Sequence, residues 1–385
     1  MREVMKTRGS VVVVAVAIAL VAVAAGCGGG GGTGQPAATS PPASTPATSP
    51  ATGAGDTTAP ATTAASKPAS LTVALDWFPN PDHVSLFYAL HHNYWKDQNL
   101  DVALKTPSDP TAGLKLVAAN KFDLSIYYES ELYFAAEQKL PVITVATLIP
   151  NPLNSLIASA DSKVKGPSTI KGAKVGVAGL PTDDAILATI REKEGLSEGD
   201  VTSVNVGFNL VPAVLSHKVD AIIGGYRNVE GIQIGQETGK PATIIPLDTV
   251  GIPHFDELVI VANKDRLSSD PAYADAVRRF IAGMVKGYQG VQSDPSGAIA
   301  EQKQDTKGYS DKFLEASVPL TISLLKPTDS TPYSCINLGQ WTRYGKWMVD
   351  NGLLKTPIDV SQVATNQYND ACGATAAATT STGGY

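Results

Sequence analysis

The chain has 385 residues, of which 43% are hydrophobic, so it is long enough for two domains and apolar enough for a sizeable core. Its formal net charge is −6 and its isoelectric point is near 5.4. This acidic balance argues against a nucleic-acid-binding protein, which would carry a basic stripe.

Residues 1–26 have the pattern of a secretory signal peptide. Arg2, Lys6 and Arg8 precede an apolar run at 11–25, and small residues follow it. A run of 15 residues is shorter than the ~20 that span a bilayer, so we expect cleavage rather than a permanent membrane helix.

Cys27 stands directly after this segment. The residues before it, Ala24, Ala25 and Gly26, resemble a bacterial lipobox in which Ala24 replaces the usual leucine. We expect Cys27 to be lipidated, because a two-chain lipid holds a soluble domain at a membrane. Ordinary secretion with Cys27 as a free thiol is the alternative. Lipidation predicts an extracytoplasmic protein anchored to the outer face of the cytoplasmic membrane.

The segment that follows contains almost no large apolar side chain and is rich in Gly, Pro, Ala, Ser and Thr. We expect residues 27–70 to form a lipidated, disordered tether, because they cannot bury enough surface to offset the entropy of ordering. Residues 373–385 have the same composition and are expected to form a flexible tail. In an exported chain, Cys335 and Cys372 are expected to pair as a structural disulfide; two unrelated thiols are the alternative.

Between tether and tail, short β-type runs alternate with helical patterns. A first series has expected strands at 71–75, 101–105, 122–128 and 141–149, with helices at about 83–97, 110–120 and 129–138. A second series has strands at 173–179, 202–207, 220–225 and 242–247, with helices at 183–194 and near 211–216. A strand at 256–263 returns beside the first series, and four helical patterns follow at 271–292, 295–304, 311–325 and 337–352.

This alternation is typical of α/β proteins with mostly parallel sheets. The second series has the size of a lobe inserted into the first. We therefore expect a two-lobed α/β fold with a ligand cleft between the lobes. Lobe 1 would comprise residues 71–155 and 250–372, and lobe 2 residues 156–249.

Aromatic and acidic residues gather where the expected strands end. In open α/β sheets, ligands bind outside the carboxyl ends of the strands. Five junctions carry these residues: 76–80, 127–130, 180–184, 224–230 and 251–255. We expect these segments to line the cleft.

Four motifs in this order resemble the NMT1/THI5-like group of ABC-transporter solute-binding proteins: LDWFPNPDH (75–83), KGAKVGVAG (171–179), DAIIGGYRNVEG (220–231) and PHFDELVIVANKD (253–265). The resemblance covers about residues 71–350. It implies a type II periplasmic-binding-protein fold that closes on a small ligand and delivers it to a permease and its ATPase. The DWFPN motif with the later GGYxNxE is most similar to the branch that binds thiamine-precursor pyrimidines such as formylaminopyrimidine.

The resemblance implies that Trp77 and Tyr226 stack on a heterocyclic ring, that the Glu230 carboxylate accepts from its amino group, and that Asn80 also bonds the ligand. The chemistry agrees, because stacking favours flat rings and charge-assisted hydrogen bonds are strong. Tyr226 and Glu230 would share one face if a helix starts there. The alternatives are a core position for Trp77 and a solvated helix position for Glu230.

Other candidate ligand-binding residues come from the same junctions. Alternation along the strand lets at most one of Tyr127 and Tyr128 face the ligand, and Tyr128 is favoured because it lies nearer the strand end. Asp76 and Glu129 are further candidates. His83 stands in the first turn of the first helix, where it is either a ligand-binding or a capping residue. Phe255 either walls the cleft or packs under the hinge.

Asp183 and Asp184 open a helix, with Thr182 or Asp183 as its expected N-cap. They occupy the positive helix end that would otherwise bind an anion. Together with Asp76, Glu129 and Glu230, Asp183 indicates a ligand that is rich in N–H or O–H donors, or a cation. Sulfonate and nitrate ligands are therefore disfavoured.

No motif indicates an enzyme, a metal site or a cofactor. The sequence contains no G-x-S-x-G, no G-x-x-x-x-G-K-[ST] and no H-E-x-x-H. The yeast members of the group carry a CCCFC motif that this sequence lacks. We expect a monomeric solute-binding lipoprotein of an ABC importer. The alternatives are binding of another flat heterocycle such as riboflavin, and a ligand-sensing domain without transport.

Overall fold

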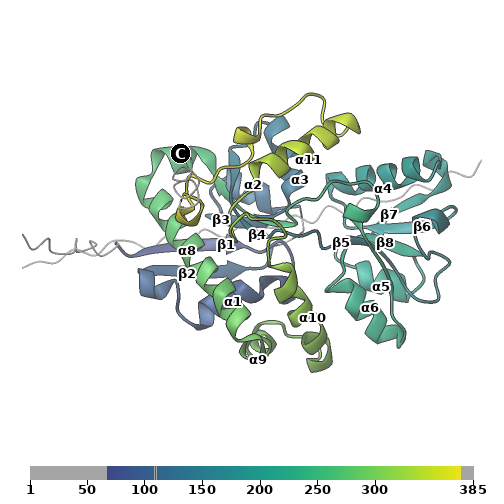
Figure 1. Ribbon diagram of the computed structural model, residues 1–385, viewed down its shortest axis with the longest axis horizontal. Coiled ribbons are helices and arrows are strands. Elements are labelled where there is room, and N and C mark those ends of the chain that lie inside the picture. Colours follow the sequence, from purple (N-terminus) through teal and green to yellow (C-terminus); the bar gives the residue numbers. More distant parts are fainter. Residues whose placement is uncertain (1–66, 108, 110, 374–385) are drawn as a thin grey trace, which may run out of the picture. The chain divides into compact units, whose positions relative to one another are not determined.

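Two mixed β-sheets organise the part of the chain that the computed structural model describes, which is residues 67–107, 109 and 111–373 (Figure 1). These residues fall within one compact unit, Thr63–Tyr385. The expected signal peptide, Cys27, nearly all of the tether and all but the first residue of the tail lie outside the described residues. Within the described part, no helix is both long and apolar enough to cross a membrane.

Sheet A has the strand order β2-β1-β3-β10-β4. Its strands are β1 (Ala69–Ala74), β2 (Leu100–Lys105), β3 (Leu124–Tyr127), β4 (Val142–Ile149) and β10 (Leu258–Asn263). β2, β1 and β3 run parallel, whereas β10 is antiparallel to both β3 and β4. Every residue of β3, β4 and β10 is buried, as expected for strands that are covered on both faces.

Sheet B has the strand order β7-β6-β8-β5-β9. Its strands are β5 (Asn154–Ala158), β6 (Lys174–Val177), β7 (Thr202–Asn205), β8 (Ala221–Tyr226) and β9 (Thr243–Pro246). β7, β6 and β8 run parallel, and β5 is antiparallel to β8 and β9. In each sheet, three parallel strands are thus followed by one antiparallel strand, and a fifth strand pairs antiparallel with that one.

Helices cover both faces of each sheet. In sheet A, α1 and α8 lie on one side, and α2, α3 and α11 lie on the other; in sheet B, α4 lies opposite α5 and α6 (Figure 1). The helices are α1 (Val84–His91), α2 (Gly113–Ala118), α3 (Glu129–Glu137), α4 (Pro181–Lys193), α5 (Leu210–Leu215), α6 (Glu230–Thr238), α7 (Lys264–Ser269), α8 (Pro271–Ser293), α9 (Pro295–Asp305), α10 (Asp311–Leu324) and α11 (Leu338–Asp350). We call sheet A with its helices lobe 1, and sheet B with α4, α5 and α6 lobe 2.

Several features differ from the sequence predictions, among them the helix α7, which was not predicted. The antiparallel strand β5 was not predicted, because a five-residue run (NSLIA) between two longer β-type runs has little periodicity of its own. The first helix was predicted to reach residue 97, but α1 ends at His91. Asn93 then adopts a left-handed backbone with φ of 57°, which terminates the helix.

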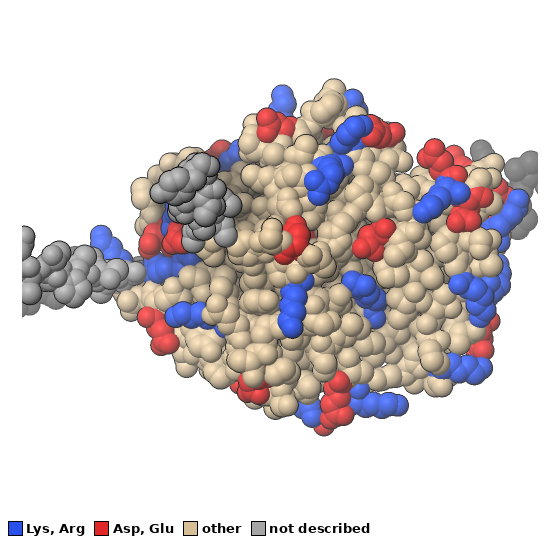
Figure 2. All heavy atoms as spheres, viewed as in Figure 1, with Lys and Arg blue, Asp and Glu red and all other residues tan. Residues whose placement is uncertain are grey.

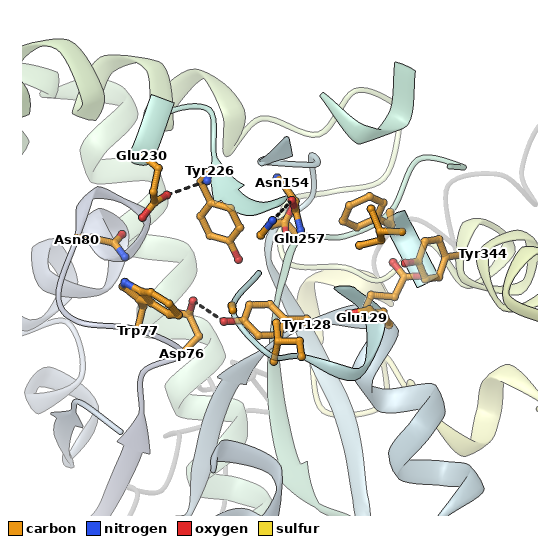
Figure 3. A pocket seen from close by; sticks show the side chains of 17 residues that line it. Asp76, Trp77, Asn80, Tyr128, Glu129, Asn154, Tyr226, Glu230, Glu257 and Tyr344 are labelled. Atoms are coloured by element: carbon orange, nitrogen blue, oxygen red, sulfur yellow. Dashed lines mark hydrogen bonds between the residues drawn. The ribbon is translucent and has the colours of Figure 1, made fainter. Parts of the chain in front are cut away.

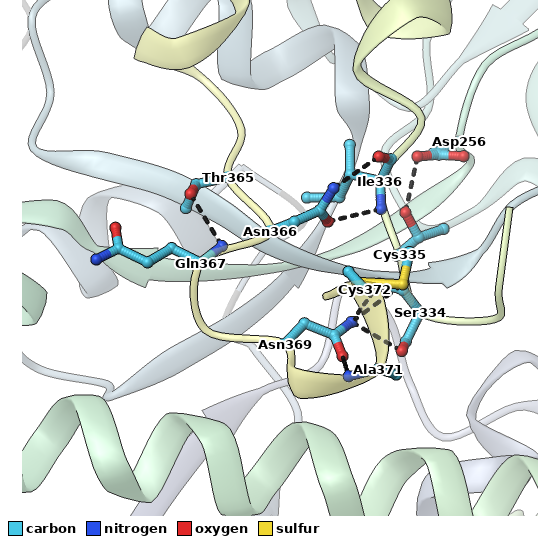
Figure 4. The surroundings of a disulfide bond; sticks show 11 residues. Asp256, Ser334, Cys335, Ile336, Thr365, Asn366, Gln367, Asn369, Ala371 and Cys372 are labelled. Carbon is cyan, nitrogen blue, oxygen red and sulfur yellow. Dashed lines mark hydrogen bonds between the residues drawn. A yellow bond between two sulfur atoms is a disulfide. The ribbon is translucent and has the colours of Figure 1, made fainter. Parts of the chain in front are cut away.

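The chain crosses between the sheets twice, once from β4 to β5 and once from β9 back to β10. The C-terminal segment then returns to the outer edge of sheet A, where Val363 accepts from the amide of Thr144 in β4. A disulfide between Cys335 and Cys372, the pair expected from the sequence, ties this segment down (Figure 4). The amide group of Asn369 supports it by donating to the Ser334 carbonyl and hydroxyl oxygens at 3.0 and 2.9 Å.

Candidate functional site

A cavity of about 650 Å³, including its open mouth, lies between the two lobes (Figure 3). The loops after β1 and β3 of sheet A and after β6 and β8 of sheet B all reach it. Of the residues predicted to bind ligand, eight line the cavity: Asp76, Trp77, Asn80, Tyr128, Glu129, Tyr226, Glu230 and Phe255. His83 and Asp183 do not line it.

His83 orients the loop after β1. Its Nδ1 accepts from the backbone N–H of Asn80 at 3.3 Å, which leaves the proton on Nε2. Nε2 donates to Oδ1 of Asp76 at 2.8 Å, and the Tyr128 hydroxyl donates to the other Asp76 oxygen at 3.3 Å. Because its ring is fully buried and both its nitrogens are bonded, His83 is a capping and positioning residue, the second of the two roles predicted for it.

Asn80 ends the same loop and begins the next turn. Its Oδ1 accepts from the amide of Asp82 at 2.7 Å and caps the short 3-10 helix η1 (Pro81–His83). The backbone oxygen of Asn80 accepts from the Gln302 side chain of α9 at 2.9 Å. The sequence LDWFPNPDH therefore encodes a turn whose polar groups are bonded to one another, which keeps Asn80 in place at the cavity.

Trp77 connects the two lobes. Its ring packs edge-on against Phe208, which lies between β7 and α5 of lobe 2, with 4.2 Å between ring centroids. Phe78 also contacts Phe208, at 4.8 Å, but is 49% exposed. The sequence analysis did not identify Phe208. The only indication of Phe208 in the sequence was that it is a single aromatic residue directly after the expected strand 202–207.

Tyr226 and Glu230 stand on either side of the turn after β8. Tyr226 is the last residue of β8 and Glu230 the first of α6, so the helix on which they would have shared one face does not include Tyr226. The turn nevertheless brings them together, because Oε2 of Glu230 accepts from the amide of Tyr226 at 2.8 Å. Burial raises the pKa of Glu230 to about 7.

Asp183 is turned away from the cavity. Its Oδ2 accepts from the amides of Gly179 and Leu180 at 2.8 and 2.9 Å. The N-cap of α4 is Leu180 rather than Thr182 or Asp183, because Pro181 takes the first helical position. Thr182 does line the cavity, and its hydroxyl donates across the lobes to Oε1 of Glu131 at 2.9 Å.

Glu257 is the most consequential residue that the sequence analysis missed. Its Oε2 accepts from the amides of Leu153 and Asn154 at 2.6 and 2.7 Å, so it joins the two segments that cross between the sheets. Burial raises its pKa to about 7. It follows from the antiparallel direction of β10 that the residues just before this strand lie at the same sheet edge as the residues just after β1 and β3. In the sequence, the only indication of this position was the acidic pair in the motif HFDEL (254–258), at the start of the expected strand.

The lining of the cavity is acidic and aromatic. It includes four carboxyl groups, those of Asp76, Glu129, Glu230 and Glu257, and among its lining residues in the described part of the chain none is Lys, Arg or His. No group of three or more His, Cys, Asp or Glu residues suited to a metal ion occurs within the described ranges. Such a lining can accept hydrogen bonds from a ligand but offers no positive charge to an anion.

Comparisons with known proteins identify the family of the chain. The model of the NMT1/THI5-like family matches residues 80–298. A Haemophilus influenzae protein whose name assigns it to thiamine biosynthesis is 35% identical, over 59% of this chain and 71% of its own length. The formylaminopyrimidine-binding protein of Halalkalibacterium halodurans is 27% identical, over 75% of this chain and 87% of its own.

Two further likenesses concern chemistry and fold. The 4-amino-5-hydroxymethyl-2-methylpyrimidine phosphate synthase THI11 of Saccharomyces cerevisiae is 27% identical, over 60% of this chain and 69% of its own. The alkanesulfonate-binding protein SsuA of Xanthomonas axonopodis pv. citri, solved with MOPS, superposes with a TM-score of 0.62. It is 14% identical over 78% of this chain and 99% of that protein, so the likeness shows a shared two-lobed α/β fold.

Proposed function

Since the chain belongs to the NMT1/THI5-like family, we propose that it is a solute-binding protein that captures an aminopyrimidine precursor of thiamine between its lobes. The observation that carries this proposal is the composition of the cavity, in which aromatic rings and four carboxyl groups face one space with no basic side chain among the described lining residues. The binding protein for formylaminopyrimidine among its relatives supports the same ligand class.

The proposed ligand pose uses the groups that the loops present. The flat ring would stack against Trp77 and Tyr226, each aromatic partner contributing ~0.5–1.5 kcal/mol beyond area burial. Glu230 would accept from the amino group, because only one of its oxygens is needed by the amide of Tyr226. Asn80 would bond the same ring edge through its side-chain amide.

Ligand binding would favour the closed arrangement of the lobes, because the ligand would contact Trp77 and Asn80 of lobe 1 and Tyr226 and Glu230 of lobe 2 together. Bonds between the lobes already exist in the structure. The side chain of Asn228 in lobe 2 donates to Asp82 of lobe 1 at 2.6 Å. The closed pair of lobes would be the form that a permease recognises.

Two other activities of similar proteins fit the site less well. A sulfonate would meet carboxyl groups and no cation at this cavity. A pyrimidine phosphate synthase of the yeast type would need the cysteine-rich CCCFC motif, whereas the cysteines of this chain are Cys27 and the disulfide pair. We therefore propose binding without catalysis.

Delivery to a membrane importer completes the proposal. Lipidation of Cys27 would anchor the protein to the outer face of the cytoplasmic membrane, and residues 28–70 would tether the binding unit. Its partners would be an ABC permease and its ATPase, and it would act as a monomer. On the face shown in Figure 2, acidic and basic side chains of the described residues are interspersed rather than gathered by sign.

A thermal-shift screen of the purified protein tests the ligand class. The compounds are formylaminopyrimidine, hydroxymethylpyrimidine, thiamine, riboflavin, taurine and nitrate. A ligand of the folded state raises the melting temperature at concentrations well above its dissociation constant. We expect a shift with the pyrimidines that is lost in Glu230→Gln. A shift with taurine or nitrate and none with any heterocycle would overturn the proposal, and a shift with riboflavin alone would replace the ligand.

A further inference from the structure

Glu129 has an unused acceptor at one end of the cavity. It is the first residue of α3, and its side chain is fully buried although it lines the cavity. Its Oε2 accepts from the amide of Asp256 at 2.7 Å. Its Oε1 has no hydrogen-bond partner among the described residues.

A buried carboxyl oxygen without a partner is unfavourable, because it has lost its hydrogen bonds to water and gained none in exchange. Burial and the nearby charge of Asp256 raise the pKa of Glu129 well above its usual value, and a hydrogen bond donated to Oε1 by a ligand would favour the ionised form and lower this pKa again. Such a group is stabilised when a donor reaches it. Because Glu129 lines the cavity, a bound molecule can supply that donor.

The surroundings of Glu129 lie at the opposite end of the cavity from the proposed ring site. The rings of Phe255 and Tyr344 pack together with 5.3 Å between their centroids, and Ser130 interacts with the Tyr344 hydroxyl. In Figure 3, Glu129 and Tyr344 lie at the opposite side of the cavity from Trp77, Asn80 and Glu230.

The sheet topology gives the same separation. Glu129 follows β3, whereas Trp77 and Asn80 follow β1, and these neighbouring strands are ~4.8 Å apart. A bare pyrimidine ring held at Trp77 and Asn80 leaves the end of the cavity around Glu129 unfilled. A ring that carries a short substituent on the side of Glu129 can fill both.

We propose that Glu129, Ser130, Phe255 and Tyr344 form a second subsite, in which Oε1 of Glu129 accepts a hydrogen bond from an N–H or O–H donor on a short substituent of the ring. This inference rests on the proposed function and sharpens its ligand class. The substituent is a hydroxymethyl, aminomethyl or acylaminomethyl group. A phosphate ester is disfavoured, because no basic side chain among the described lining residues is present to balance its negative charge.

Isothermal titration calorimetry with a graded set of compounds tests the subsite. The compounds are 4-amino-2,5-dimethylpyrimidine, which lacks a donor on the substituent, its 5-hydroxymethyl and 5-formylaminomethyl counterparts, and the phosphate ester of the hydroxymethyl compound. We expect at least one donor-bearing compound to bind tenfold or more tightly than the dimethyl compound. We expect the phosphate ester to bind more weakly than the dimethyl compound.

The variant Glu129→Gln tests whether the higher affinity of the donor-bearing compounds depends on Glu129. Its amide oxygen can still accept from Asp256, which turns the NH₂ group toward the cavity and places a donor opposite the donor of the ligand. We expect the donor-bearing compound to lose at least tenfold more affinity than the dimethyl compound does. Glu237→Gln, an exposed position on α6, is the matched control and is expected to leave all affinities within twofold.

The outcomes separate the two proposals. If no pyrimidine binds, the proposed function fails and the subsite fails with it. If the dimethyl compound binds as tightly as the donor-bearing compounds, or if Glu129→Gln weakens all of them equally, the subsite is overturned and the ring site stands. Tight binding of the phosphate ester overturns the subsite as well. The comparison among ligands in the unmodified protein decides the question even if Glu129→Gln does not fold.

Discussion

The two lobes share one strand order but present different chemistry to the cavity. In lobe 1, the loops after β1 and β3 carry Asp76, Trp77, Asn80 and Glu129, and bonds within that lobe hold Oδ1 of Asp76, Oδ1 of Asn80 and Oε2 of Glu129. In lobe 2, the loop after β6 presents mainly apolar groups around Leu180, whereas the turn after β8 presents Tyr226 and Glu230.

This difference follows from the turns that the loops contain. After β6, Oδ2 of Asp183 accepts from the amides of Gly179 and Leu180, so this carboxyl oxygen is engaged within the loop. After β1, His83 holds Asp76 at the cavity instead. Equivalent positions in a shared topology therefore locate a site, whereas local hydrogen bonds decide which side chains face it.

The largest expected effect concerns the crossing segments that join the lobes. Glu257→Ala removes the acceptor of the buried Leu153 and Asn154 amides, which costs about 3–5 kcal/mol of unfolding free energy at roughly 1–3 kcal/mol per unsatisfied group. Glu257→Gln keeps one oxygen that can accept both bonds and is expected to cost about 1 kcal/mol. Urea unfolding measures both, and equal losses for the two variants would contradict this role of Glu257.

The next largest expected effect is on the affinity for pyrimidines, through the ring of Trp77 in lobe 1. Trp77→Ala is expected to weaken pyrimidine binding by about 100-fold, because it removes both stacking and buried apolar area. Phe78→Ala is the matched control: Phe78 also contacts Phe208 but is half exposed and does not line the cavity. We expect that control to change the affinity by less than about threefold. Calorimetric titration measures the affinity of both variants. Similar losses of affinity in Trp77→Ala and Phe78→Ala would mean that Trp77 acts through Phe208 rather than on the ligand.

A pH effect of intermediate size follows from the buried acids of both lobes. Burial raises the pKa of Glu230 and Glu257 to about 7 and that of Asp256 to about 6. Between about pH 4 and 7 the folded protein therefore holds protons that the unfolded chain has released. The free energy of unfolding should fall as the pH rises through this window, by about 2 kcal/mol or more between pH 5 and 7.5.

Urea unfolding at several pH values without ligand checks this expectation. The double variant of Glu230→Gln and Glu257→Gln should show a shallower fall, because two of the proton-binding groups are gone. A free energy of unfolding that rises from pH 5 to 7.5 would show that these carboxyl groups are ionised in the folded protein.

The smallest effect concerns the bond between the lobes at Asn228. Asn228→Ala is expected to weaken ligand binding by about five- to tenfold without any contact to the ligand, because a bond to Asp82 worth about 1–1.5 kcal/mol no longer favours the closed form. Thr321→Val removes the other bond that the Asn228 amide donates to lobe 1, and with it the bond from the Thr321 hydroxyl to the Ser317 carbonyl oxygen, so a loss of up to about fivefold is expected. A variant Asn228→Ala that loses unfolding free energy but keeps its affinity would show that this bond is the same in all states of the protein.

Much of the fold and part of the site could be predicted from the sequence. Alternating β-type and helical patterns are local, so most elements were identified within a few residues. The rule that ligands bind at the carboxyl ends of strands led to Asp76, Trp77, Tyr128 and Glu230. It could not reveal β5, whose five residues carry no period, nor the direction of β10, which depends on pairing between distant segments.

By itself, the sequence determined the two α/β series, the family motifs and the aromatic and acidic loops, because these are patterns of neighbouring residues. Only the tertiary structure decided which of these side chains face the cavity. His83 and Asp183 were candidate ligand-binding residues because of their positions, but both ring nitrogens of His83 and Oδ2 of Asp183 are bonded to nearby protein groups. Glu257 reaches the cavity because β10 runs antiparallel, and Glu129 keeps a free oxygen because Asp256, far along the chain, bonds only the other.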